Sequence, residues 1–127
     1  DLLNGEPGIY SSRYAGPNAT DYENNQRLIK ELERYKCEKI TARFHSVIAI
    51  VEPSQNKKRI FHGTWEGRIM LEQKGKNGFG YDPLFYIDDL GATAGELTES
   101  QKNRLSHRAI AMRAATNYLV SKTEYIK

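Results

Sequence analysis

The chain has 127 residues, of which 39% are hydrophobic and 28% charged, and it carries a formal net charge of +3. This profile predicts one domain, residues 1–127, with a hydrophobic core, and it excludes an intrinsically disordered chain. No apolar run is long enough to span a bilayer, so we expect no membrane-embedded segment. Cys37 is the only cysteine. It allows neither an internal disulfide nor a cysteine-based zinc site, which favours a reducing, cytoplasmic compartment.

The first residue is Asp1, and the opening residues read like the middle of a sequence. We therefore expect a further segment upstream of Asp1. The pI near 9.0 favours an anionic ligand, although the basic residues are spread along the chain and form no long block.

The first half of the chain predicts a loop, a helix and a strand. Residues 6–18 are rich in Gly, Pro and Ser, which indicates an ordered loop. The capping-box spacing of Thr20 and Glu23, followed by apolar residues at helical spacing, predicts a helix from Asp21 to about Lys36. The β-branched and continuously apolar segment Thr41 to Val51 predicts a central strand that is buried on both faces.

The middle of the chain predicts a hairpin and a flexible loop. A polar turn at 53–58 leads into an alternating pattern from Phe61 to Leu71, which is typical of the partner strand. The glycine-rich stretch from Gly75 to Pro83 predicts a loop, and the apolar residues 84–87 predict one more short strand.

Two helices are expected towards the end of the chain. Thr98 and Gln101 have capping-box spacing and predict a short helix, while Ser106 is placed to cap a longer helix that ends at about Lys122. Helices and strands together predict an α/β chain.

The loop from Gly75 to Pro83 places aromatic rings beside glycines. Backbone amides could approach a flat ligand there while Phe79 or Tyr81 stacks on it, a geometry that suits a nucleobase. The spacing matches neither the Walker phosphate loop nor the dinucleotide fingerprint. Taken alone, the loop is equally consistent with a tight surface turn whose aromatic rings fold into the core.

The second candidate site lies where the longer helix begins. Ser106 would cap the helix, and His107 and Arg108 would place cations in a first turn where the helix dipole disfavours them. Lys102 lies four residues earlier and adds a further donor. Such a cluster could bind phosphate oxygens or the carbonyl oxygens of a base. An ordinary capped helix with solvated side chains is the alternative.

Taken in order, these motifs resemble the inosine/xanthosine triphosphate pyrophosphatase family. The resemblance covers nearly the whole chain and rests on four separated segments: residues 3–16, residues 61–63 with 66–69, residues 78–83, and Lys102 with residues 106–109.

The resemblance implies a magnesium-dependent hydrolase that cuts ITP, dITP or XTP into the monophosphate and pyrophosphate. It implies an elongated mixed β-sheet flanked by helices and a two-lobed nucleotide cleft, of which this chain covers mainly the second lobe. A homodimer is expected, as is usual in the family. The residues that would bind the substrate are Phe79, Gly80, Tyr81, Asp82, Lys102, Ser106, His107 and Arg108.

The chemistry of these residues agrees with that implication. Hypoxanthine and xanthine carry a carbonyl at position 6, where adenine carries an amino group. Donors from Arg108, His107 and backbone amides would therefore accept the first two bases and face adenine donor against donor.

The phosphate loop, the catalytic residues and the magnesium ligands of the family lie upstream of Asp1. The carboxylates near the pocket loop show no metal-binding spacing and are expected to be turn and cap residues: Asp82, Asp88, Asp89 and Glu96. Residues 94–97 also depart from the family pattern, with Gly95 before Glu96-Leu97. His45 and His62 are expected to be structural. We therefore expect these 127 residues alone to bind nucleotide weakly and not to hydrolyse it.

Two alternatives remain. A basic, aromatic-bearing sheet domain could bind nucleic acid, although no nucleic-acid partner is expected from the resemblance. A nucleotide-sensing module could keep the base pocket without catalysis.

Overall fold

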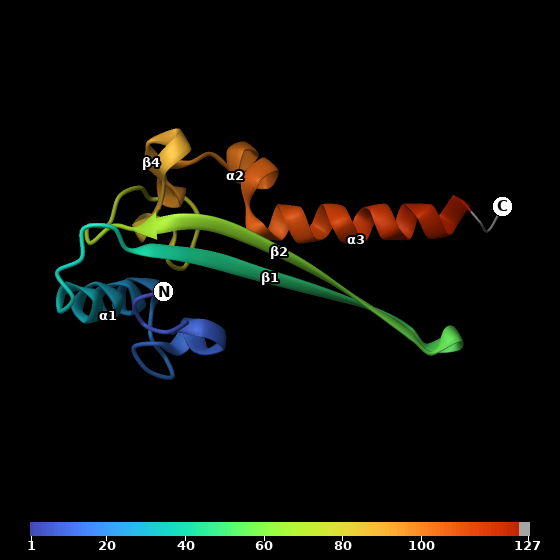
Figure 1. Cartoon of the computed structure of the whole chain (residues 1–127), viewed down its shortest axis with the longest axis horizontal. Helices are drawn as coiled ribbons and strands as arrows, with labels where there is room; N and C mark the ends of the chain where they lie inside the picture. The colour runs from blue at the N-terminus through green and yellow to red at the C-terminus, as the bar shows by residue number, and fades with distance from the viewer. Residues whose placement is uncertain (125–127) are drawn as a thin grey trace. The chain divides into compact units, whose positions relative to one another are not determined.

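The computed structural model describes residues 1–124. Its helices and strands, in chain order, are α1 (Asp21–Glu33), β1 (Thr41–Glu52), β2 (Lys57–Ile69), β3 (Phe85–Ile87), β4 (Ala92–Thr93), α2 (Glu99–Leu105) and α3 (His107–Glu124) (Figure 1). Short 3-10 turns connect several of them, the longest being Gly8–Arg13. Within the described residues, none of the helices has the length and apolar content that a bilayer crossing requires.

The chain divides into two compact units. The first comprises Asp1–Ala42 and Glu66–Glu99, and the second comprises Arg43–Trp65 and Ser100–Lys127. The strands β1 and β2 each contribute residues to both units.

The strands form a four-stranded sheet in the order β1-β2-β3-β4. The pairings of β2 with β3 and of β3 with β4 are antiparallel, with Arg68 opposite Tyr86 and Tyr86 opposite Thr93. The α/β class is confirmed, but in the described part of the chain the sheet is antiparallel and not mixed. Short turns join β1 to β2 and β3 to β4, and the longer loop 70–84 joins β2 to β3.

The hairpin of β1 and β2 is confirmed, and the prediction that β1 is a central strand buried on both faces is wrong. β1 lies at one end of the strand order, and its side chains alternate between exposed and half-buried. Val47 and Val51 are 60% and 62% exposed. An apolar run is buried on both faces only where other elements pack against both, and here α3 packs against one face of β1.

The predicted helix after Thr20 is confirmed as α1, which ends at Glu33, three residues before the predicted end. Its capping box is present: Thr20 Oγ1 accepts from the Glu23 amide at 3.2 Å, and the Glu23 carboxylate accepts from the Thr20 amide. The helix ends early because the chain turns left-handed at Lys36, where φ is +48°.

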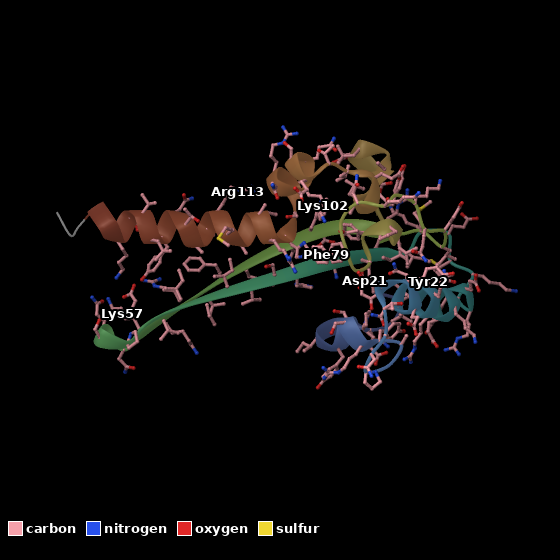
Figure 2. All side chains as sticks on the ribbon, turned by 180° about the vertical axis from the view of Figure 1, so that it is seen from behind. Asp21, Tyr22, Lys57, Phe79, Lys102 and Arg113 are labelled. Atoms are coloured by element: carbon pink, nitrogen blue, oxygen red, sulfur yellow. The ribbon has the colours of Figure 1, made fainter. Side chains whose placement is uncertain are left out.

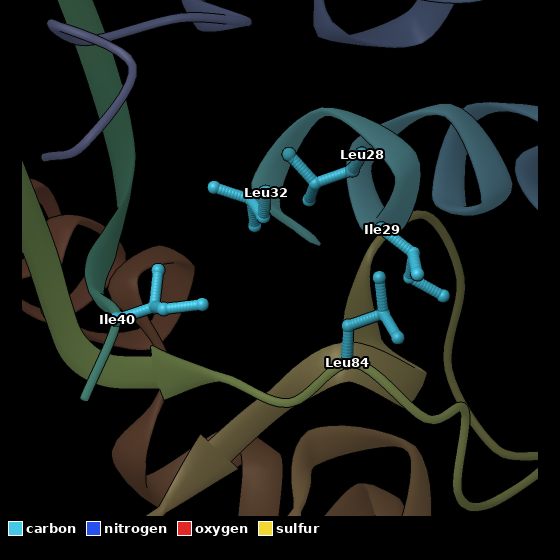
Figure 3. Close-up of a cluster of buried hydrophobic side chains, with 5 residues drawn as sticks. All are labelled: Leu28, Ile29, Leu32, Ile40 and Leu84. Carbon is cyan, nitrogen blue, oxygen red and sulfur yellow. The ribbon is translucent and has the colours of Figure 1, made fainter. Parts of the chain in front are cut away.

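The core of the first unit lies between α1 and the segment that leads into β3. Its buried side chains are Leu28, Ile29, Leu32, Ile40 and Leu84 (Figure 3). Three of them come from the apolar stripe of α1, as the helical spacing predicts. The core therefore fixes α1 against Leu84, the residue that directly follows the glycine-rich loop.

In the second unit, α3 lies close against the hairpin at Gly63. A side-chain carbon at this position would lie 2.1 Å from the carbonyl oxygen of His107 and 2.8 Å from the amide nitrogen of Ala111. Ala111 and Ala115 are buried on the same face of the helix. Only a glycine on the strand and alanines on the helix permit so close an approach of the two backbones.

Further along α3, the hydroxyl of Tyr118 donates to Glu52 Oε1 at 2.9 Å, and Lys122 Nζ lies 3.4 Å from Glu52 Oε2. The ring of Tyr118 also packs against Phe61, with ring centroids 5.5 Å apart. The Tyr118 hydrogen bond is the main cause that lowers the pKa of Glu52 below 4.5. These contacts attach the later turns of α3 to the end of β1.

We expect Gly63→Ala to destabilise the protein by about 1–3 kcal/mol, because the added methyl group would overlap the backbone of α3. Urea unfolding measures the effect. Ala49→Val is the matched control, since it adds methyl groups on the exposed face of β1 and should change the free energy of unfolding by less than about 0.5 kcal/mol. Equal effects of the two substitutions would contradict the close approach.

We expect the stabilising contribution of Glu52 to be present above pH 4.5 and to be lost as the pH falls further, because its pKa is lower in the folded state. Tyr118→Phe removes the main cause of that shift. The variant should show a smaller loss of melting temperature between about pH 5 and about pH 3, the range in which carboxyl groups titrate. NMR titration should place the Glu52 pKa closer to its ordinary value, and an unchanged Glu52 pKa would contradict this assignment.

Candidate functional site

The predicted pocket loop lies in the first unit and is held by its own backbone. Gly80 has φ +60°, a conformation that favours glycine. The buried carboxylate of Asp82 accepts a hydrogen bond from the Phe79 amide at 3.0 Å, and the Asp82 amide donates back to the Phe79 carbonyl. Together these bonds fold the loop into a tight turn that leaves the Phe79 ring 55% exposed.

Two side chains of α1, one turn apart, hold Gly80 from the other side. Asp21 Oδ2 accepts from the Gly80 amide at 2.9 Å, and Asn25 Nδ2 donates to the Gly80 carbonyl at 3.1 Å. Figure 2 labels Asp21 at the start of α1 and Phe79 on the loop. Both backbone groups of Gly80 are thus engaged within the protein, and so is the amide of Phe79. The amides of Phe79 and Gly80 therefore stabilise the conformation of the loop.

Tyr81 points into the first unit and anchors the loop there. Its hydroxyl donates to the Ser11 carbonyl at 2.6 Å, and its ring packs against the core. Burial raises the pKa of this hydroxyl to about 12, so it stays a proton donor at neutral pH. Of the two aromatic rings in the loop, Phe79 is the more exposed.

The remaining predicted residues lie in the second unit. Ser106 is buried and caps α3, as predicted, by accepting from the Ala109 amide at 3.2 Å. The Ser106 amide donates to the carbonyl of Lys102 in α2 at 2.9 Å. This hydrogen bond connects the capping residue of α3 to the last turn of α2. Lys102 is half-buried and Arg108 is exposed.

His107 is held by an aromatic contact. Its ring lies against Phe44 of β1, with centroids 4.9 Å apart and planes inclined by 21°. Phe44 in turn contacts Trp65 at 6.3 Å. The first turn of α3 is therefore fixed on the hairpin by its imidazole, and His107 is not a freely solvated side chain.

The carboxylates near the loop have local roles. Asp82 accepts from the Phe79 amide, Asp88 pairs with Arg68 at 2.5 Å, and Glu96 accepts from the Thr93 amide at 3.0 Å. Among residues 1–124 no group of three or more His, Cys, Asp or Glu side chains could hold a metal ion. The described residues do not fit a magnesium site.

The Ham1 family description matches residues 1–118 of the chain. The chain belongs to the Ham1 family. A dITP/XTP pyrophosphatase from Thermoanaerobacter sp. (strain X514) is 49% identical over 122 residues, which are 96% of this chain and 61% of that protein. The predicted resemblance to the inosine/xanthosine triphosphate pyrophosphatases is thereby confirmed.

Solved Ham1 structures have the same fold over the same region. A HAM1 protein from Coxiella burnetii matches with a TM-score of 0.89 at 46% identity, over 94% of this chain and 61% of that one. The Staphylococcus aureus Ham1 protein matches with a TM-score of 0.90 at 40% identity, over 95% and 62%. The chain thus spans about three fifths of the length of the Ham1 proteins that it resembles.

The sequence analysis missed three residues outside the predicted pocket loop that hold it in place: Ser11, Asp21 and Asn25. A signal was available for Asn25, which lies three residues before Leu28 on the apolar stripe of α1 and is only 1% exposed. A polar side chain on a buried helix face is expected to serve a specific partner.

We expect Asn25→Ala to destabilise the protein by about 1–3 kcal/mol, because it removes the donor to the partly buried Gly80 carbonyl. It should also speed hydrogen exchange at the Gly80 amide by loosening the loop. Urea unfolding and hydrogen exchange measure the two effects. Gln26→Ala, on the exposed face of the same helix, is the matched control. Equal effects of the two substitutions would contradict the hydrogen bond from Asn25 to Gly80.

Proposed function

We propose that this chain carries the nucleobase-recognition part of a Ham1 pyrophosphatase that hydrolyses non-canonical purine nucleoside triphosphates, ITP, dITP and XTP, to the monophosphate and pyrophosphate. One observation carries the proposal: an exposed Phe79 ring stands on a loop fixed from two sides, in a chain 49% identical to a dITP/XTP pyrophosphatase. A rigid aromatic platform of this kind suits a flat base.

In this proposal the loop supplies stacking and shape. Phe79 covers one face of the purine, while Gly80, Tyr81 and Asp82 keep the ring in place through their internal bonds. The amides of Phe79 and Gly80 are already engaged by carboxylates, so in this proposal these two amides do not read the base edge.

The donors in the proposal are Lys102, His107 and Arg108. They are cationic or neutral donors in a single helix–cap–helix segment of the second unit, and Ser106 fixes the geometry of that segment. A 6-oxo purine offers them an acceptor, whereas the 6-amino group of adenine would leave donor against donor. Such a mismatch costs about 1–3 kcal/mol, or roughly fivefold to a hundredfold in affinity.

Recognition and reaction are separate in this proposal. The described carboxylates are used by turns, caps and an ion pair, and no reaction step is assigned to them. The 127 residues by themselves therefore bind the nucleotide and do not hydrolyse it. A homodimer and a cytoplasmic location belong to the same proposal and rest on the resemblance alone.

We expect the chain to bind ITP and XTP at least about tenfold more tightly than ATP, since the donors discriminate at position 6. Isothermal titration calorimetry measures the affinities. Phe79→Ala should weaken all three nucleotides alike, because stacking does not read position 6, whereas Arg108→Ala should reduce the preference for ITP over ATP. Arg34→Ala, at an exposed arginine directly after α1, is the control and should change neither.

Three results would overturn parts of the proposal. Equal affinity for ITP and ATP contradicts base recognition. Strong, salt-sensitive binding of oligonucleotides without preference for ITP favours the nucleic-acid alternative. Release of pyrophosphate from ITP by the chain alone contradicts the separation of recognition from reaction.

A further inference from the structure

Two exposed histidines of the second unit face each other across the hairpin. His45 Nδ1 on β1 lies 2.9 Å from His62 Nε2 on β2. The ring planes differ by only 18° and the centroids lie 5.1 Å apart. The two nitrogens are therefore at hydrogen-bond distance, and in the tautomers that pair them one proton lies between them.

We propose that this pair, which the sequence suggested was structural, is a binding site for a late first-row divalent metal ion, with Cu²⁺ bound most tightly. A metal ion would replace the shared proton and accept one lone pair from each ring. The proposal is independent of nucleotide recognition, because neither histidine belongs to the predicted base pocket.

The separation of the nitrogens favours one class of ion. With metal–nitrogen bonds of about 2.0–2.1 Å, two tetrahedral ligands lie about 3.4 Å apart, while two ligands at 90° lie about 2.9 Å apart. The observed 2.9 Å is the separation of a hydrogen-bonded pair, and it is nearer to the right-angle arrangement of a square-planar or tetragonal site than to the tetrahedral one. Cu²⁺ and Ni²⁺ prefer that arrangement with nitrogen ligands, and Cu²⁺ binds most tightly in the divalent series.

The neighbours of the pair agree with this choice. The residues two positions away along each strand, which share its face, are Arg43, Val47, Ile60 and Thr64. None of these four carries a carboxylate, so the site has little affinity for Mg²⁺ or Ca²⁺, which require oxygen ligands. With two nitrogen ligands and no carboxylate beside them, binding depends on both imidazoles acting together.

The rings must turn slightly for their lone pairs to converge on one ion. Their exposure permits this, since no buried packing fixes either side chain. The strands that carry them are paired in a hairpin and hold the two α-carbons in place. A preorganised backbone with adjustable rings is suited to a two-point metal site.

Titration calorimetry of the whole chain, free of any histidine tag, tests the proposal with CuCl₂, NiCl₂ and ZnCl₂ in a buffer that does not bind metals. We expect one Cu²⁺ per chain. The Cu²⁺ electron paramagnetic resonance spectrum should show two nitrogen ligands, and Ni²⁺ should bind more tightly than Zn²⁺. Tighter binding of Zn²⁺ than of Ni²⁺ would overturn the right-angle geometry without the need for any variant.

His45→Asn and His62→Asn should each weaken Cu²⁺ binding at least tenfold. The double variant, which keeps His107, sets the baseline for weak binding elsewhere on the chain. Val47→Asn, an exposed position on the same face of β1, is the matched control and should bind as the unchanged chain does. Circular dichroism confirms that each variant is folded. Unchanged Cu²⁺ affinity in either folded single variant would overturn the two-histidine site.

Discussion

The predicted pocket depends on the two hydrogen bonds between α1 and Gly80. Asp21 and Asn25 are four residues apart, so they project from the same side of the helix and reach both backbone groups of one residue. The same helix buries Leu28, Ile29 and Leu32 in the core of the first unit. Hydrophobic packing thus places the helix, and the helix then places the loop. The exposed Phe79 ring stands at the end of this sequence of contacts.

The second unit is organised by a different constraint, the lack of a side chain at Gly63. The close approach of backbone to backbone positions the first turns of α3 on the hairpin. Phe44 then receives the ring of His107, and Ser106 ends up buried where it caps the helix. The stacking of the His107 ring on Phe44 therefore helps to hold the first turn of α3 on the hairpin.

The proposed separation between binding and reaction is supported by how the polar groups are used. Carboxylates that could hold a metal ion are instead engaged by the amides of Phe79, Gly80 and Thr93 and by Arg68. Such bonds stabilise a turn or a cap, and they leave no cluster of oxygen ligands among the described residues. Ham1 proteins of known structure are longer than this chain, which spans about three fifths of their length.

The sequence by itself determined the local elements and the family. Caps at Thr20 and Ser106, the alternating pattern of β2 and the glycine-rich loop all act within a few residues, so their spacing is visible in the chain. The order of the motifs also sufficed to indicate the Ham1 relationship.

Only the tertiary structure decided which faces are covered and which distant groups meet. The apolar run in β1 could not reveal that one face lacks a partner, because burial depends on what packs there. Tyr81 turns inward to Ser11 while Phe79 stays exposed, although both are aromatic residues of one loop. His45 and His62 are 17 residues apart in sequence and 2.9 Å apart in space, because the register of a hairpin brings them together.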